Sequence, residues 1–254
     1  MGGARMDGGR GPGRKGLRSW ALGLLLAACA ALLGMAAALL GVSAAATGAY
    51  DVLAQEVVDA GGMDVGLDAL PEQNPDYVGW LTVEGTSISY PVVQPSEDED
   101  ADFYLTHDYW GALSGVGCPY LDQRASAEGA HLLVYGHHLS LSDQMFSPIY
   151  QAYLQEVFDG IGTATWTALD GETTEFTPVF ALSVDKSYAA IQTFSFSSKA
   201  ELHAWLRTVA AGATAEREGW EELVQDADRV LTLVTCSSTI AGQRERTLLV
   251  FVAS

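Results

Sequence analysis

Two apolar runs near the C-terminus constrain the fold more than any other feature of the sequence. Residues 230–235 are aliphatic and β-branched, and residues 247–252 form a second run of the same kind. Each run has the length and composition of a buried strand and is too short for a typical buried helix. Because a connection of only about ten residues separates them, we predict that they form an antiparallel pair.

The connection between these two runs begins with a thiol and ends with a guanidinium. Cys236 directly follows the first run, and Arg246 directly precedes the second. An antiparallel pairing brings them side by side, as a nucleophile and a donor to an oxyanion. The alternative is that Cys236 is a small buried hydrophobic residue, the commoner role of a single cysteine. Arg244 could serve the same oxyanion or merely solvate the turn.

A third apolar run, residues 132–135, ends in Gly136-His137-His138. It delivers titratable side chains to the end of another predicted strand, which favours the catalytic interpretation of Cys236. Neighbouring side chains in a strand point to opposite faces, so only one of the two histidines can face a shared cleft.

These runs resemble the signatures of the sortases, the cysteine transpeptidases of Gram-positive cell surfaces. Thr232–Cys236 matches their TLxTC signature, Tyr135–His137 matches their catalytic histidine motif, and Arg246 matches their arginine just inside the following strand. Residues 74–94 and 103–107 look specifically like class B.

The resemblance, which covers residues 50–254, implies a mostly β fold. The expected architecture is a closed sortase-type β-barrel with an N-terminal helix and a long helix before the last strand pair, preceded by one transmembrane helix. Cys236 would attack the threonine carbonyl of a C-terminal sorting signal, NPxTN-like or LPxTG-like, in a secreted protein. Arg246 would stabilise the oxyanion, and His137 would protonate the departing amide and later deprotonate the incoming amine. The acceptor would be an amine of a cell-wall precursor or of a pilin lysine, and no cofactor or metal is expected.

The resemblance also distinguishes residues that lie close together in the sequence. It places the catalytic histidine directly after glycine, which selects His137 and makes His138 a predicted rim residue. His107 is predicted to be structural. Thr235 and Ser237 flank the thiol and are predicted to shape the substrate pocket.

The N-terminal part of the chain predicts a membrane anchor. Residues 20–42 contain no charged side chain and are long enough as a helix to cross the hydrocarbon core. Residues 1–19 form a basic leader, which predicts a cytoplasmic N-terminus and an extracellular catalytic domain on the cell membrane. A cleaved secretory signal with a site at residues 44–46 and a lipoprotein site at Cys29 are the alternatives. The apolar run is too long for the first and continues too far beyond Cys29 for the second.

The remaining chain divides into residues 43–75, predicted to be a juxtamembrane helix and a linker, and residues 76–254, the catalytic domain. The protein has 13 Lys and Arg against 32 Asp and Glu, a net charge of −19. Such a charge argues against binding of nucleic acid or anionic lipid. Residues 97–102 are acidic but lack the spacing of a calcium loop, and we predict a solvated loop there.

Local signals place further elements. Asp170-Gly171 predicts a hairpin between residues 163–169 and 175–184. Residues 198–201 fit a capping box at the start of a helix whose apolar stripe is Leu202, Trp205, Leu206 and Val209. Cys118 and Cys236 could form a disulfide in an exported domain. A nucleophilic Cys236 must stay free, however, so Cys118 is predicted to pack as a thiol.

Two other classes of function remain open on the residues alone. In a membrane-tethered peptide-binding module, Cys236 would be incidental. A papain-like exported protease is disfavoured, because that family carries its cysteine ahead of its histidine, whereas here His137 precedes Cys236.

Overall fold

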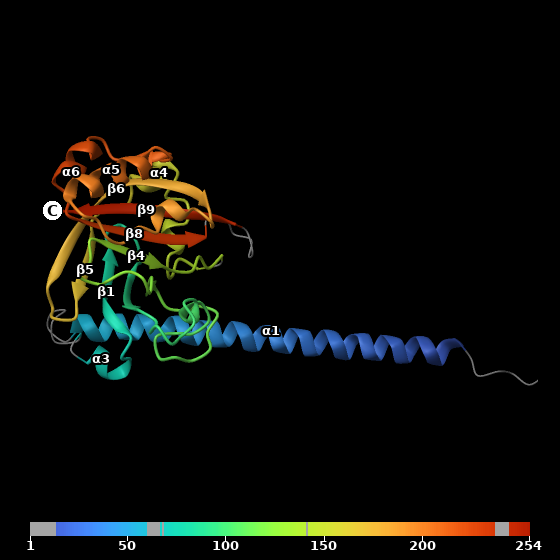
Figure 1. The fold of residues 1–254 in the computed structure, drawn as a ribbon. Helices are drawn as coiled ribbons and strands as arrows, with labels where there is room; N and C mark the ends of the chain where they lie inside the picture. The colour runs from blue at the N-terminus through green and yellow to red at the C-terminus, as the bar shows by residue number, and fades with distance from the viewer. Residues whose placement is uncertain (1–13, 60–66, 68, 141, 237–243) are drawn as a thin grey trace, which may run out of the picture. The chain divides into compact units, whose positions relative to one another are not determined.

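The computed structural model describes residues 14–59, 67, 69–140, 142–236 and 244–254 (Figure 1). The chain divides into two compact units, Met1–Ala45 and Ala46–Ser254. The second unit contains the whole sheet and both clusters of buried apolar side chains.

Helix α1 (Arg14–Asp59) is continuous. The helix predicted to follow the membrane segment is therefore not a separate element but the last turns of α1. Tyr50, Leu53 and Val57 are buried at the helical spacing that the sequence predicts. No helix in the described part of the chain combines the length and the hydropathy that a membrane crossing requires.

The described strands form one sheet. They are β1 (Tyr77–Val83), β2 (Ser89–Val93), β3 (Tyr120–Leu121), β4 (His131–Tyr135), β5 (Ala164–Ala168), β6 (Thr173–Asp185), β7 (Ala215–Glu216), β8 (Arg229–Cys236) and β9 (Glu245–Ala253). The order is β5-β1-β2-β3-β4-β8-β9-β6, and pairing of β6 with β5 closes the barrel. The short β7 pairs only with β6. The predicted mostly β closed barrel is confirmed.

Short helices connect these strands. They are α3 (Leu70–Gln73), α4 (Gln155–Phe158), α5 (Lys199–Ala210) and α6 (Trp220–Asp226), with 3-10 helices η1 (Phe103–Leu105), η2 (Ser147–Ile149) and η3 (Ala189–Ile191). Between β6 and β8 the sequence predicts one long helix, whereas the structure has α5, then β7, then α6. Gly219, which has a φ of +76°, precedes α6, a conformation that glycine adopts without strain.

The predicted local elements are otherwise present. Strands β8 and β9 are antiparallel, and β5 and β6 form the hairpin, with Gly171 at a φ of +82° in its turn. The Ser198 side chain caps α5 by accepting from the Glu201 N–H. The Glu201 carboxylate accepts from the Ser197 N–H rather than returning to Ser198, so only half of the capping box forms.

Strand β8 is buried on both faces. Leu231 and Leu233 pack in the cluster that draws on most strands of the barrel, while Val230 and Val234 pack in a second cluster with side chains of α5 and α6. Figure 1 shows α5 and α6 lying over β6 and β9. Burial on both faces explains why β8 reads as a continuous apolar run rather than an alternating one.

Candidate active site

The three predicted catalytic residues come from the ends of three neighbouring strands, β4, β8 and β9. Cys236 is the last residue of β8 and lies directly opposite Arg246 in the antiparallel register with β9. The sequence predicted this juxtaposition from the two apolar runs alone.

The parallel pairing of β4 with β8 brings the histidine to the same place. Tyr135 is the register partner of Val234, and the Gly136 N–H donates to the Val234 carbonyl at 3.0 Å. His137 and Cys236 each follow this register pair by two residues, in the same direction along the sheet. The sequence could not predict this pairing, because about a hundred residues separate the two strands.

The imidazole of His137 is half-buried and its Nε2 lies 2.7 Å from the Leu105 carbonyl oxygen. A carbonyl can only accept, so Nε2 carries the hydrogen and Nδ1 is left as the nitrogen for proton transfer. The sequence analysis missed Leu105 as a functional residue. Its stretch, residues 103–107, was singled out by resemblance, but a backbone carbonyl leaves no trace in the residue types.

The two other histidines near this region have different surroundings. The His138 ring stacks on Tyr150 with centroids 4.1 Å apart. The His107 ring stacks on Phe103 at 3.9 Å, and its Nδ1 lies 2.9 Å from the Phe103 carbonyl oxygen. The structure thus separates both from His137.

The two arginines also differ. Arg244 makes two hydrogen bonds of 2.8 Å to the carboxylate of Asp185 and is largely exposed. These bonds, with a smaller contribution from Ser187, hold the pKa of Asp185 well below its usual range. Arg246 lies within β9, and its Nη1 donates to the Glu245 carbonyl at 2.9 Å.

A surface hollow lies beside Arg246. A cavity of about 70 Å³ is lined by Arg246, Val234 and Tyr135, together with Leu248 and residues from the end of β6 and the segment that follows it. A second cavity of about 360 Å³ adjoins it and shares Tyr135 and Gln192. Together they extend across β9, β8, β4 and β3.

The second cavity has a polar lining built on Asp122. Burial raises the pKa of Asp122, but the Arg124 guanidinium at 2.7 Å and the Tyr135 hydroxyl at 3.1 Å outweigh burial and hold the pKa below its usual value. Asp122 therefore stays ionised and fixes the orientation of Tyr135.

Of the two predicted pocket residues, Thr235 and Ser237, the structure describes only Thr235. Thr235 is buried and lines neither cavity, and its hydroxyl has no partner among the described residues. Alternation along β8 turns it toward the barrel interior, away from Val234. Ser237 lies outside the described residues, as does any side-chain geometry of Cys236.

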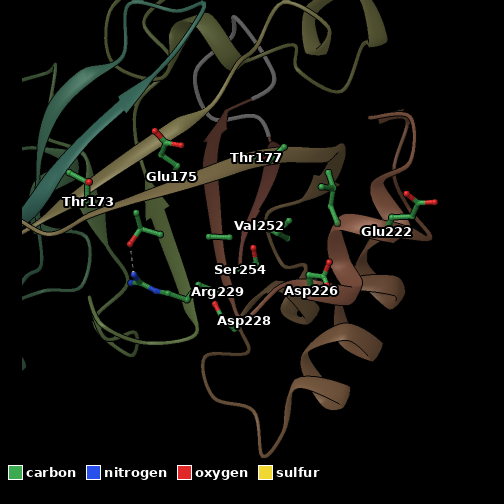
Figure 2. A pocket seen from close by; sticks show the side chains of 12 residues that line it. Thr173, Glu175, Thr177, Glu222, Asp226, Asp228, Arg229, Val252 and Ser254 are labelled. Atoms are coloured by element: carbon green, nitrogen blue, oxygen red, sulfur yellow. Dashed lines mark hydrogen bonds between the residues drawn. The ribbon is translucent and has the colours of Figure 1, made fainter.

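Another cavity, of about 870 Å³, lies elsewhere. Figure 2 shows its lining, with Arg229 bonded to Thr174 and the acidic side chains Glu175, Asp226 and Asp228 around it. Arg229 is the first residue of β8 and Cys236 the last, so this cavity is at the other end of the strand. No cluster of potential metal ligands occurs among the described residues.

Comparison with known proteins gives a consistent set of relatives, although no protein-family model matches the chain. Sortase B of Listeria monocytogenes is 28% identical over 175 residues, which is 68% of this chain and 67% of that protein. The crystal structure of Clostridium perfringens sortase B superimposes with a TM-score of 0.62 at 27% identity, covering 73% of this chain and 97% of that one.

The fold match extends to a more distant relative. A substrate complex of Staphylococcus aureus sortase B has a TM-score of 0.68 at 20% identity, covering 82% of this chain and 95% of that one. At this identity the match shows a shared fold and nothing further.

Proposed function

Because the chain belongs to the class B sortases, which are cysteine transpeptidases, we propose that it cleaves a C-terminal sorting signal of a secreted protein and joins the new carboxyl end to an amine. The observation that carries this proposal is that Cys236 and Arg246 are register partners, and that His137 follows β4, the strand paired with β8 on its other side.

The first half of the reaction forms a thioacyl intermediate. The Cys236 thiolate attacks the threonine carbonyl carbon of the signal, and a C–S bond forms as the carbonyl becomes an oxyanion. His137, as an imidazolium, protonates the departing amide nitrogen from Nδ1, and the C–N bond breaks. The bond from Nε2 to the Leu105 carbonyl holds the ring so that Nδ1, and not Nε2, transfers the proton.

The second half transfers the acyl group. An incoming amine attacks the thioester carbonyl and gives its proton to neutral His137, and Cys236 departs as the thiolate. Arg246 donates to the oxyanion in both halves. Because its backbone is fixed within β9, this donor costs little reorganisation during the reaction.

The substrates follow from the family. We infer a sorting signal of the NPxTN or LPxTG kind and, as acceptor, an amine of a peptidoglycan precursor or a pilin lysine. The hollow beside Arg246 and the cavity that reaches Asp122 share Tyr135, and this surface is where we place the peptide. Staphylococcus aureus sortase B has been solved as a substrate complex.

We also propose that residues 20–42 anchor the protein in the cell membrane, with residues 1–19 in the cytoplasm and the barrel outside. In support, this part of α1 carries no charge, and Leu24, Leu25 and Leu33 are exposed. Intact mass of protein from membrane fractions should show the N-terminal leader. A new N-terminus near residue 46 or a lipid on Cys29 would contradict the anchor.

The reaction is tested with the detergent-solubilised full-length chain and a library of peptides carrying NPxTN-like and LPxTG-like signals. Mass spectrometry should show an acyl adduct on Cys236 and, with triglycine or diaminopimelate added, a ligated product. Cys236→Ala is the control that should give neither. Peptide binding without any adduct in the wild-type chain would instead favour a peptide-binding module.

A further inference from the structure

One loop, residues 103–118, holds the imidazole of His137 from two directions, and we call it the cradle loop. At one end, the Leu105 carbonyl accepts the Nε2 hydrogen bond at 2.7 Å. At the other end, Gly117 lies against the ring. A methyl group on Gly117 would come within 2.7 Å of the Tyr104 carbonyl oxygen, and within 2.9 Å of Cδ2 and 3.4 Å of Nε2 of His137. The close approach of the backbone to the ring therefore requires a residue without a side chain at position 117.

The Gly117 end of the cradle loop is tied to helix α1 through Tyr50. The Tyr50 hydroxyl donates to the Gly117 carbonyl at 2.9 Å and accepts from the Tyr109 N–H at 2.9 Å. Tyr50 is only 1% exposed, and its ring packs edge-on against Tyr90. Water therefore cannot replace these bonds, and removing the hydroxyl leaves a buried N–H and a buried carbonyl without this partner.

The Leu105 end is tied to the residues that lead into β1. The Asn74 amide donates to the Tyr104 hydroxyl at 3.0 Å and to the Tyr109 carbonyl at 2.6 Å, and the Tyr104 hydroxyl donates to Asp76 at 2.7 Å. The Cys118 N–H joins the two ends of the loop by donating to the Tyr104 carbonyl at 3.0 Å. Tyr50 is the side chain that bonds directly to the backbone of Gly117, at the point where the loop meets the ring.

We propose that Tyr50 is a positioning residue for the transfer reaction, and that it acts through Gly117 to fix the orientation and tautomer of His137. The last turns of α1 then belong functionally to the catalytic domain rather than to a linker. The inference rests on the proposed acid–base role of His137, but the orientation of the ring can be measured without that role.

The test compares variants of the detergent-solubilised full-length chain. Tyr50→Phe keeps the buried ring and removes only the hydroxyl. We expect kcat for the thioacylation of a sorting peptide to fall about tenfold with KM within about twofold, since misplacement by about 1 Å costs up to about 10²-fold. Gly117→Ala, which drives a methyl group into the ring, should lower kcat by about 10²-fold.

Gly111→Ala is the matched control. Gly111 lies in the same loop with a φ of +75°, against +69° for Gly117, but a methyl group there meets no atom within 4 Å. The backbone strain is therefore alike in the two alanine variants, whereas the methyl group at position 117 also meets His137 and the Tyr104 carbonyl oxygen. We expect kcat of Gly111→Ala to stay within about twofold of wild type, because the ring geometry is unchanged.

A readout independent of catalysis is the ¹⁵N spectrum of the labelled histidine ring. In Tyr50→Phe and Gly117→Ala, the His137 nitrogen shifts should move away from the Nε2–H tautomer, and in Gly111→Ala they should not. In the double variant, Tyr50→Phe should add little to Gly117→Ala, because both act through one contact.

Two results would overturn the proposal. One is a Tyr50→Phe variant with unchanged ring shifts and unchanged kcat, a test that stands even if Gly117→Ala does not fold. The other is a Gly111→Ala variant that loses as much activity as Gly117→Ala, which would indicate general weakening of the loop. If the wild-type chain turns over no peptide, the proposed function fails, and the ring shifts still decide whether Tyr50 positions His137.

Discussion

The two ends of strand β4 carry the same residue type in opposite circumstances. At its start, His131 is fully buried, with Nδ1 at 2.8 Å from the Thr193 carbonyl and Nε2 at 2.9 Å from the Thr232 hydroxyl. Just beyond its end, His137 is half-buried, and its Nε2 is bonded to the Leu105 carbonyl, which leaves Nδ1 for proton transfer. A histidine whose two nitrogens are both occupied holds strands together, whereas one with a nitrogen to spare can move a proton.

The same contrast extends to the neighbouring strand β8. Arg229, at its start, is half-buried and donates to the Ala127 carbonyl and the Thr174 hydroxyl. Cys236, at its end, is the register partner of Arg246 in β9. At one end of the paired strands β4 and β8, the polar side chains of His131 and Arg229 are held by hydrogen bonds. At the other end lie the groups that the reaction needs.

The largest effect is expected at the Cys236 end. Cys236→Ala and His137→Ala should each abolish transpeptidation, a loss of about 10⁴-fold or more, since neither the nucleophile nor the acid has a substitute. Melting temperatures should stay close to that of the wild type. Turnover of one sorting peptide is the measurement.

His138→Ala is the control for the histidine assignment. Its ring stacks on Tyr150, so most activity should remain. Equal losses of turnover in His137→Ala and His138→Ala would contradict the assignment of His137 as the catalytic histidine.

Arg246→Ala should give the next largest loss, about 10²–10³-fold in turnover, the typical cost of one oxyanion donor. Arg246→Lys should recover little, because a single ammonium cannot reproduce the planar fork of the guanidinium. Steady-state kinetics on the same peptide decide the point. A Lys variant with near-normal turnover would mean that Arg246 contributes only charge.

Much of this arrangement was predictable because its signals are local. The β8–β9 pair follows from two apolar runs and a short connection, and the β5–β6 hairpin follows from Asp170-Gly171. The stripe of α5 is likewise a matter of spacing within one element. Such signals depend on neighbours in the sequence, which the sequence displays directly.

The rest depends on contacts between distant backbone atoms. The parallel neighbours β4 and β8 are about a hundred residues apart, and Tyr50 reaches Gly117 across 67 residues. In both the Leu105 and the Gly117 contacts with His137, the partner is a backbone group. Every residue carries the same backbone groups, so the sequence gives no indication of which one meets the histidine.

The buried end of β4 predicts an effect on stability rather than on activity. Burial, only partly offset by the Thr193 carbonyl and by Asp122, lowers the pKa of His131 from 6.5 to about 4. Between pH 6.5 and about pH 4, the imidazole of His131 is protonated in the unfolded chain and neutral in the folded chain. Stability is therefore complete above pH 6.5 and falls as the pH drops toward 4, by about 3 kcal/mol.

Urea unfolding of the full-length chain at a series of pH values measures this loss. In His131→Gln, which cannot titrate, the dependence on pH between 6.5 and 4 should flatten, with turnover per folded molecule unchanged at pH 7.5. The same slope in both proteins would assign the acid sensitivity to other groups.

The smallest effect is expected from Arg244, and it sharpens the contrast with Arg246. The two guanidiniums are two residues apart, but Arg244 precedes β9 and is committed to Asp185 through two bonds of 2.8 Å. To serve the oxyanion it would have to give up both bonds, whereas Arg246 is already held beside the hollow. Arg244→Ala should therefore lower turnover no more than about threefold, far less than the loss of an oxyanion donor.

Because this change also leaves the Asp185 carboxylate beside the same hollow without its partner, Arg244→Ala combined with Asp185→Asn separates the two causes. Turnover of the double variant at the wild-type level would assign the small loss to the released carboxylate. If Arg244→Ala proves as damaging as Arg246→Ala and the double variant stays impaired, then Arg244 is the oxyanion donor and the strand does not select between them.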